Sequence, residues 1–162
     1  TATYTPSNVQ SRYIRIRGVT AAGANTSSRL AINDIRFWTG AGGTGTKYPT
    51  TNLTSNTSET GIAVSAGHSY SATYAPWKAC DSSSGSMWWA LGTNAANNWW
   101  EIEFESFTYP TIPTINSMVV RFNTQTDALY FSLVGSNTGA FAGEETNYGV
   151  FGIIENTTQT FG

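Results

Sequence analysis

Short runs in which apolar and polar residues alternate are the dominant pattern of this chain. Alternation with a period of two places successive side chains on opposite faces of a β-strand. In residues 11–19, for example, Ile14 and Ile16 share one face while Arg15 and Arg17 lie on the other. Because helical periodicity is hard to find anywhere in the chain, the sequence predicts an all-β fold.

Further alternating runs extend this pattern to residue 161. Their apolar positions are Leu30 and Ile32, Ile35 and Phe37, then Trp100, Ile102 and Phe104, then Met118, Val120 and Phe122, and finally Leu129, Phe131 and Leu133. Weaker candidates are 148–155 and 158–161. The phase changes at Asn33-Asp34, which predicts a β-bulge or a strand end. Segments rich in turn residues, such as 40–49 and 81–86, separate the runs, so we expect six to eight strands in one sandwich or barrel spanning residues 1–162.

Composition restricts the partners that such a domain would bind. Aromatic residues make up 14% of the 162 residues and charged residues only 11%, so the surface must consist of Thr, Ser, Asn and Gly. Such a neutral surface is associated with proteins outside cells or on virus particles. The net charge of −2 and the lack of a basic run argue against a nucleic-acid partner. No apolar stretch is long enough for membrane insertion, and Cys80, the only cysteine, is expected to be a small buried residue.

Several segments carry motifs of a known family. They are RYIRIR (12–17), LAINDIRF (30–37), KACD (78–81) followed by SMWW (86–89), WWEIEF (99–104) and YFSLVGS (130–136). Together, over residues 11–137, they resemble the discoidin, or coagulation-factor type C, domain, which includes the family 32 carbohydrate-binding modules. The resemblance implies an eight-stranded jelly-roll sandwich. The arginine-bearing strand comes first here, an order found in permuted versions in phage structural proteins, and Ser82 replaces the family's glycine after the loop aspartate.

The same resemblance implies a structural calcium ion. Its ligands would be Asp81, the Ser86 hydroxyl, a carbonyl at Lys78–Ala79, and Asp34. Calcium takes six to eight oxygen ligands, so these groups would be part of a larger set. The alternative is an Asx turn, in which Asp81 binds the backbone of its own loop.

Aromatic residues in loops are the candidates for ligand binding. Tyr74 and Trp77 lie in the 70–77 loop, and an aromatic ring there can stack on a sugar while neighbouring amides bind hydroxyls. The resemblance places the ligand at loop tips on one end of the sandwich, which gives His68, Tyr74, Trp77 and Trp38 as predicted glycan-binding residues. The alternative is that Tyr74 and Trp77 pack the loop onto the core.

Most of the remaining tryptophans are predicted to be core residues. Trp88, Trp89 and Trp100 lie in or beside strands. A buried indole N–H needs an acceptor, and loop carbonyls can supply one.

No catalytic motif emerges from the sequence. His68 is the only histidine, it has no nucleophile signature beside it, and no zinc-binding spacing occurs. Glu101, Glu103 and Glu105 share one strand face, as the carboxylates of a glycoside hydrolase would. The simpler interpretation is the solvent face of a half-buried strand, so we expect no enzymatic activity.

The sequence therefore predicts a non-catalytic binding or adhesion module that recognises surface glycans or cell-surface polysaccharide. It would belong to a phage or other extracellular assembly, at the virion surface. The alternative is a structural or decoration protein of the virion, whose sandwich mainly contacts other assembly proteins. A single shallow site binds sugar weakly, so we expect a homo-oligomer or many copies in the assembly.

Overall fold

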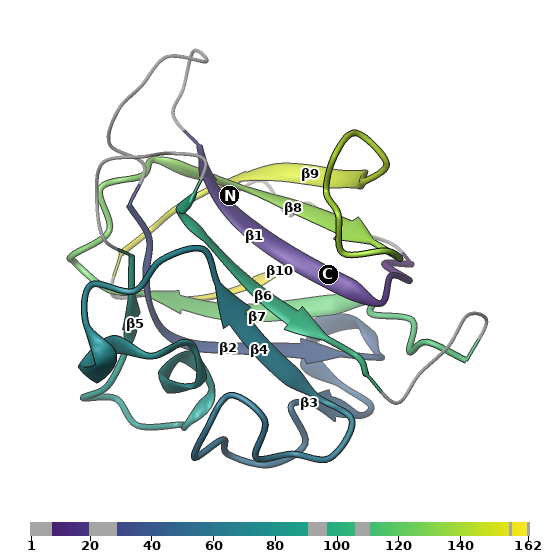
Figure 1. The fold of residues 1–162 in the computed structure, drawn as a ribbon, viewed down its shortest axis with the longest axis horizontal. Helices are drawn as coiled ribbons and strands as arrows, with labels where there is room; N and C mark the ends of the chain where they lie inside the picture. The colour runs from purple at the N-terminus through teal and green to yellow at the C-terminus, as the bar shows by residue number, and fades with distance from the viewer. Residues whose placement is uncertain (1–7, 20–28, 91–96, 106–110, 156, 162) are drawn as a thin grey trace.

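The computed structural model describes residues 8–19, 29–90, 97–105, 111–155 and 157–161. Its strands are β1 (Tyr13–Val19), β2 (Ala31–Trp38), β3 (Lys47–Tyr48), β4 (Ala63–Ala66), β5 (Trp88–Trp89), β6 (Trp99–Glu103), β7 (Ser117–Phe122), β8 (Tyr130–Ser136), β9 (Thr146–Gly152) and β10 (Thr158–Phe161). Three short 3-10 helices are η1 (Ala41–Gly43), η2 (Ala72–Tyr74) and η3 (Pro76–Cys80). The strands form two antiparallel sheets that pack as a sandwich (Figure 1), which confirms the all-β prediction.

The two sheets bury the faces that the alternation predicted. The first sheet has the order β4-β6-β1-β8-β9, and the second has β10-β7-β2-β3, with β5 paired to β2. Ile14 and Ile16 of β1 are fully buried. Phe37 of β2 stacks on Trp100 of β6 with ring centroids 6.3 Å apart, so large aromatic rings join the two sheets.

The change of phase at Asn33-Asp34 is a β-bulge, as predicted. The register between β2 and β7 shifts between Ile32 and Asp34. The buried Asn33 side chain holds the bulge: its Nδ2 donates to the Ser86 carbonyl (2.8 Å) and its Oδ1 accepts from Asn123 (3.0 Å). Because Ile35 faces the core, its neighbour Asp34 is directed to the outer face of the sheet.

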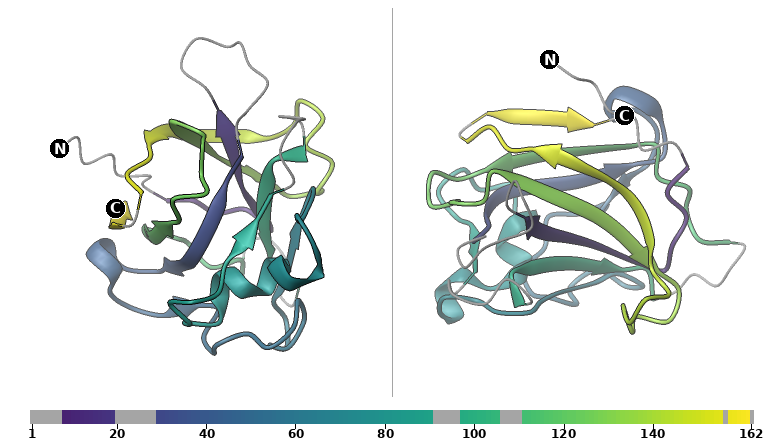
Figure 2. Two further views of the ribbon diagram at one scale, coloured as in Figure 1. Left: turned by 90° about the vertical axis from the view of Figure 1, so that its left-hand side faces the viewer. Right: turned by 90° about the horizontal axis from the view of Figure 1, so that it is seen from above.

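The last two strands lie on different sheets but close together, as the right-hand view in Figure 2 shows. Their Phe151 and Phe161 rings contact at 5.0 Å between centroids. One strand prediction was wrong in detail: Leu129 is not a core residue, since β8 begins after it and Leu129 is 64% exposed. The described residues also form the short strands β3, β4 and β5, whose apolar runs are too short to be recognised in the sequence.

Gly67 provides a test of the packing beside β6. A Cβ at this position would lie 2.6 Å from Trp99 Nε1 and would also press against the Asn97 carbonyl. Overpacking of this kind costs about 1–3 kcal/mol, so we expect Gly67→Ala to lower the free energy of unfolding measured in urea by that amount. Gly85→Ala is the matched control, because a Cβ there meets nothing within 4 Å. Equal urea midpoints for the two variants would contradict this account.

Candidate functional site

Three aromatic side chains form a cluster at the surface beside β5. Tyr70 stacks on Trp89 with ring centroids 4.2 Å apart and planes at 14°. Tyr74 packs edge-on against both, at 5.3 Å from Trp89 and 5.9 Å from Tyr70. Tyr70 is 50% exposed. We call Tyr70, Tyr74 and Trp89 the aromatic cluster; it presents one ring to solvent on a fixed aromatic base.

Two core tryptophans hold the connection that carries this cluster. The indole N–H of the buried Trp88 donates to the His68 carbonyl (3.1 Å), and that of the buried Trp100 donates to the Pro76 carbonyl (3.0 Å). The Tyr70 N–H adds a backbone bond to the Trp89 carbonyl (2.8 Å). The expectation that loop carbonyls satisfy the buried indoles is confirmed for Trp88 and Trp100, but not for Trp89.

The cluster also offers polar groups. The Trp89 indole N–H is buried and has no hydrogen-bond partner among the described residues. His68 is exposed two positions before Tyr70. Because the Trp89 N–H is buried, the exposed Tyr70 ring and the exposed His68 side chain are the groups that a ligand could reach here.

The structure brings only part of the predicted ligand-binding set to this place. Tyr74 is in the cluster and His68 adjoins it in sequence. Trp77 is half-buried, packs against the core and has Lys78 Nζ 4.4 Å from its ring centroid, as the loop-packing alternative describes. Trp38 lies at the far end of β2 from Ala31, the partner of Trp89, and seven residues at about 3.3 Å each separate these ends by about 23 Å.

Two members of the cluster, Tyr70 and Trp89, were not in the predicted set. The signal for Trp89 was present in the sequence, because a strand that buries Trp88 must direct the next side chain outward. Tyr70 follows His68 in the same polar loop, but nothing in the sequence shows that it stacks on a strand residue.

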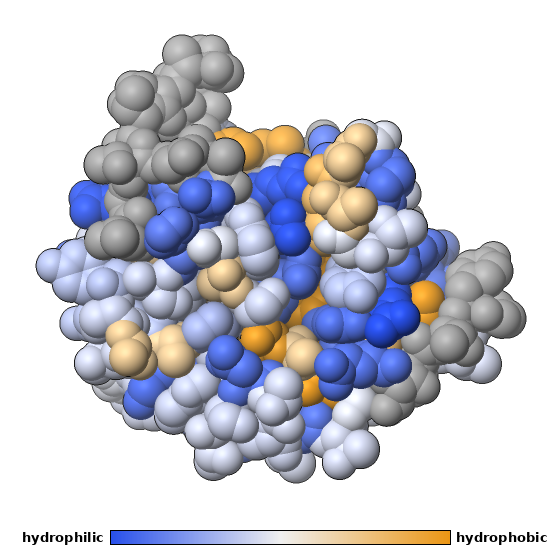
Figure 3. Space-filling model, viewed as in Figure 1, coloured by the Kyte–Doolittle hydropathy of each residue, from blue (hydrophilic) through white to orange (hydrophobic). Residues whose placement is uncertain are grey.

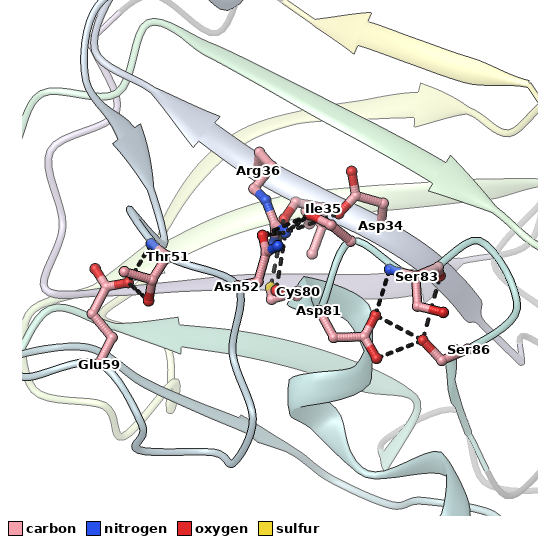
Figure 4. Close-up of polar contacts among 11 residues, drawn as sticks. Asp34, Ile35, Arg36, Thr51, Asn52, Glu59, Cys80, Asp81, Ser83 and Ser86 are labelled. Carbon is pink, nitrogen blue, oxygen red and sulfur yellow. Dashed lines mark hydrogen bonds and ion pairs between the residues drawn. The ribbon is translucent and has the colours of Figure 1, made fainter.

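The predicted calcium ligands are engaged with other groups (Figure 4). Asp81 accepts from the Ser86 hydroxyl at 2.7 and 2.6 Å and from the Ser83 N–H at 2.8 Å. Asp34 instead lies 3.4 Å from the Arg36 guanidinium. The described residues contain no group of three or more His, Cys, Asp or Glu placed to hold a metal. This arrangement is that of the Asx-turn alternative, and the calcium site stays a prediction.

Arg36 is a buried charge that ties this loop to the second sheet. It is 4% exposed and donates to the carbonyls of Ile35 (3.1 Å) and Cys80 (2.9 Å) and to Ser82 Oγ (2.7 Å). Burial raises the pKa of Asp34, with the positive charges of Arg36 and Lys47 opposing. Cys80 is buried as predicted, and burial raises the pKa of its thiol.

The outer face of the first sheet carries a network of ion pairs. Glu101 pairs with Arg15 (2.8 Å) and Glu103 with Arg12 (2.7 Å). Hydrophilic residues predominate on this face in Figure 3, with hydrophobic areas near its centre and a hydrophobic projection over the loop between β8 and β9. That loop carries Phe141, and the Arg15 guanidinium lies between the rings of Phe141 and Trp99, 3.7 Å from each centroid.

The burial of Glu101 corrects one expectation about the glutamates of β6. Glu101 does not lie on a solvent face, because it is only 7% exposed. Burial raises its pKa, while Arg15 and a hydrogen bond from Ser65 oppose that rise. Since Glu101 and Glu103 each bind an arginine, the two carboxylates serve as members of ion pairs in this structure.

No family model, curated protein or solved structure matches the chain. In the part of the chain that the structure describes, no helix is long and apolar enough to cross a membrane. The function is therefore argued from the geometry of the described residues.

The buried Glu101 predicts a specific pH dependence of stability. Its pKa is raised above the usual 4.5 in the folded protein, so the stability that it contributes is complete below that value and is lost as the pH rises through the folded pKa. Glu101→Gln removes this titration. We expect the unfolding free energy of the wild type minus that of Glu101→Gln to fall between pH 4 and pH 8, measured by urea unfolding at each pH. Glu105→Gln, an exposed change of the same kind, controls for the lost charge; a difference that rises with pH would contradict the account.

Proposed function

We propose that this chain is a non-catalytic glycan-binding module, a jelly-roll sandwich of the discoidin type, displayed by a phage or other extracellular assembly. The observation that carries the proposal is the aromatic cluster, in which the half-exposed Tyr70 is stacked on Trp89. The positions of the strands support the family assignment. Four of the segments that carry the resemblance coincide with β1, β2, β6 and β8, namely 12–17, 30–37, 99–104 and 130–136.

The cluster has the features of a sugar-binding platform. Stacking on Trp89 fixes one side of the Tyr70 ring and leaves the rest of the side chain for a ligand. The indole bonds of Trp88 and Trp100 hold the connection in place before a ligand arrives. A preorganised site loses less conformational entropy on binding, which matters most for weak ligands such as single sugars.

One such platform is shallow, so its affinity for a sugar is expected to be low. Many copies on a particle would convert weak single contacts into stable attachment. The neutral composition of the surface suits this arrangement, because neighbouring copies would not repel one another strongly.

Binding of an artificially multimerised domain to a glycan array tests the proposal. Tyr70→Ala removes the exposed ring, and we expect it to weaken binding about tenfold or more, equivalent to about 1.4 kcal/mol. Tyr130→Ala is the matched control, since Tyr130 is 38% exposed and lies outside the cluster. The array is read with calcium and with a chelator, and both proteins are checked for equal melting temperatures. Equal binding by the two variants would contradict a role for the aromatic cluster.

A second candidate function, a structural or decoration protein, is favoured by a different observation. Leu129, Val150 and Ile154 are 64%, 51% and 57% exposed and lie around the β8–β9 pair. β9 is an edge strand of the first sheet and its seven residues carry no charge. An uncharged edge with apolar neighbours is suited to contact with another subunit.

The mass of the protein in solution tests this second candidate function. If the β9 edge makes subunit contacts, Val150→Asp combined with Ile154→Asp should shift the protein toward monomer in light scattering coupled to size-exclusion chromatography. Thr57→Asp, an exposed change in the loop before β4 at the opposite edge of the same sheet, should leave the mass unchanged. A wild-type protein that is monomeric at every concentration would argue against subunit contacts through β9.

A further inference from the structure

A small polar pocket lies on the outer face of the second sheet, apart from the aromatic cluster. Its volume is about 170 Å³, and it is lined by Asn33, Asp34, Ser82, Ser83, Ser84, Val119, Arg121 and Thr158. β2, β7 and β10 supply its floor, and the loop that follows η3 supplies its wall. None of its lining residues belongs to the aromatic cluster.

The register of three strands assembles the floor of this pocket. Asp34 is opposite Arg121, and Arg121 is opposite Thr158. Arg121 faces outward because its neighbours Val120 and Phe122 are fully buried. The bulge at Asn33 directs Asp34 to the same side, so the three polar side chains form a row across three strands.

The two charged groups of the pocket lack strong partners within the protein. Asp34 Oδ1 is buried without a hydrogen bond, although it lies 3.4 Å from the Arg36 guanidinium and Lys47 adds a further positive charge; the side chain as a whole is 38% exposed. Arg121 makes no hydrogen bond or ion pair with the residues that the structure describes. The pocket thus holds a group that only accepts hydrogen bonds and a group that only donates them.

We propose that this pocket binds one neutral sugar residue through two neighbouring hydroxyl groups. A hydroxyl both donates and accepts, so such a pair can donate to Asp34 and accept from Arg121. The hydroxyls of Ser83, Ser84 and Thr158 can act in either sense, and Val119 offers an apolar contact for the C–H groups of the ring. The inference rests on the proposed glycan-binding function and adds a second site to it.

Charge and size select this ligand class. The lining carries one negative and one positive side chain, Asp34 and Arg121, which cancel and favour a neutral ligand over an ionic one. A volume of about 170 Å³ is below the roughly 300–1,000 Å³ of pockets that take drug-sized ligands. A single ring fits this size, whereas an oligosaccharide would extend beyond the pocket.

The test follows the methyl resonances of Val119 by NMR while methyl glucoside, methyl galactoside and methyl mannoside are added singly. We expect at least one of them to shift these resonances with a Kd of about 1–10 mM, a weak affinity of about 3–4 kcal/mol. Arg121→Gln should weaken that binding at least tenfold without lowering the melting temperature, because the Arg121 side chain has no hydrogen-bond or ion-pair partner among the described residues. Thr160→Val is the matched control: it lies opposite Val119 on β10 but does not line the pocket, so it should bind as the wild type does.

The outcomes separate this site from the aromatic cluster. Val119 shifts that persist in Tyr70→Ala and vanish in Arg121→Gln would support the second site. If array binding is lost with Tyr70→Ala while no glycoside moves Val119, the pocket inference is overturned and the proposed function stands. Tighter binding of methyl glucuronide or of glycine than of any neutral glycoside would overturn the neutral-sugar assignment.

Discussion

The burial of the Arg36 guanidinium constrains the loop after η3, which forms the wall of the polar pocket. Arg36 is almost fully enclosed on β2, and a buried arginine with unmatched donors would destabilise the fold by several kcal/mol. Its acceptors include the Cys80 carbonyl at the end of η3 and the Ser82 hydroxyl just after it. Satisfying Arg36 therefore fixes the chain against the second sheet at the point where the wall of the pocket begins.

The connection between β4 and β5 is held at both of its ends by buried groups that need partners. The Trp88 and Trp100 indoles donate to the carbonyls of His68 and of Pro76, the first residue of η3. Arg36 donates to Cys80, the last residue of η3, and to Ser82 just after it. Along the chain, Tyr70 and Tyr74 of the aromatic cluster come before η3, and the Ser82–Ser84 wall of the pocket comes after it. This one connection thus contributes to two separate surfaces.

The sequence patterns predicted well which face of each strand is buried, but they predicted poorly which distant residues contact one another at the surface. The inward positions of β1, β6 and β7, the bulge at Asn33 and the acceptors for buried indoles all follow from burial, which acts on each residue in turn. The buried Glu101 pairs with Arg15, and Arg15 lies against the Phe141 ring from a loop forty positions after Glu101; alternation contains no such information. The pocket depends on strand register, and faces alone do not determine which strands pair. Trp38 was grouped with Tyr74 because the resemblance places the ligand at loop tips on one end of the sandwich, although the length of β2 separates Trp38 from the cluster.

Asp34 and Arg121 are directly opposed on neighbouring strands and carry opposite charges, yet they form no ion pair. Cross-strand pairs of this kind usually interact and add up to about 1 kcal/mol to stability. Asp34 is also not well matched to Arg36, since the 3.4 Å approach leaves Oδ1 without a hydrogen bond. If Asp34 only neutralised the charge of Arg36, a closer contact between the two side chains would be expected. If Asp34 formed an ion pair with Arg121, the two side chains would close the pocket. An open pocket between two unsatisfied, opposite groups is the arrangement expected of a site that completes its hydrogen bonds with a ligand.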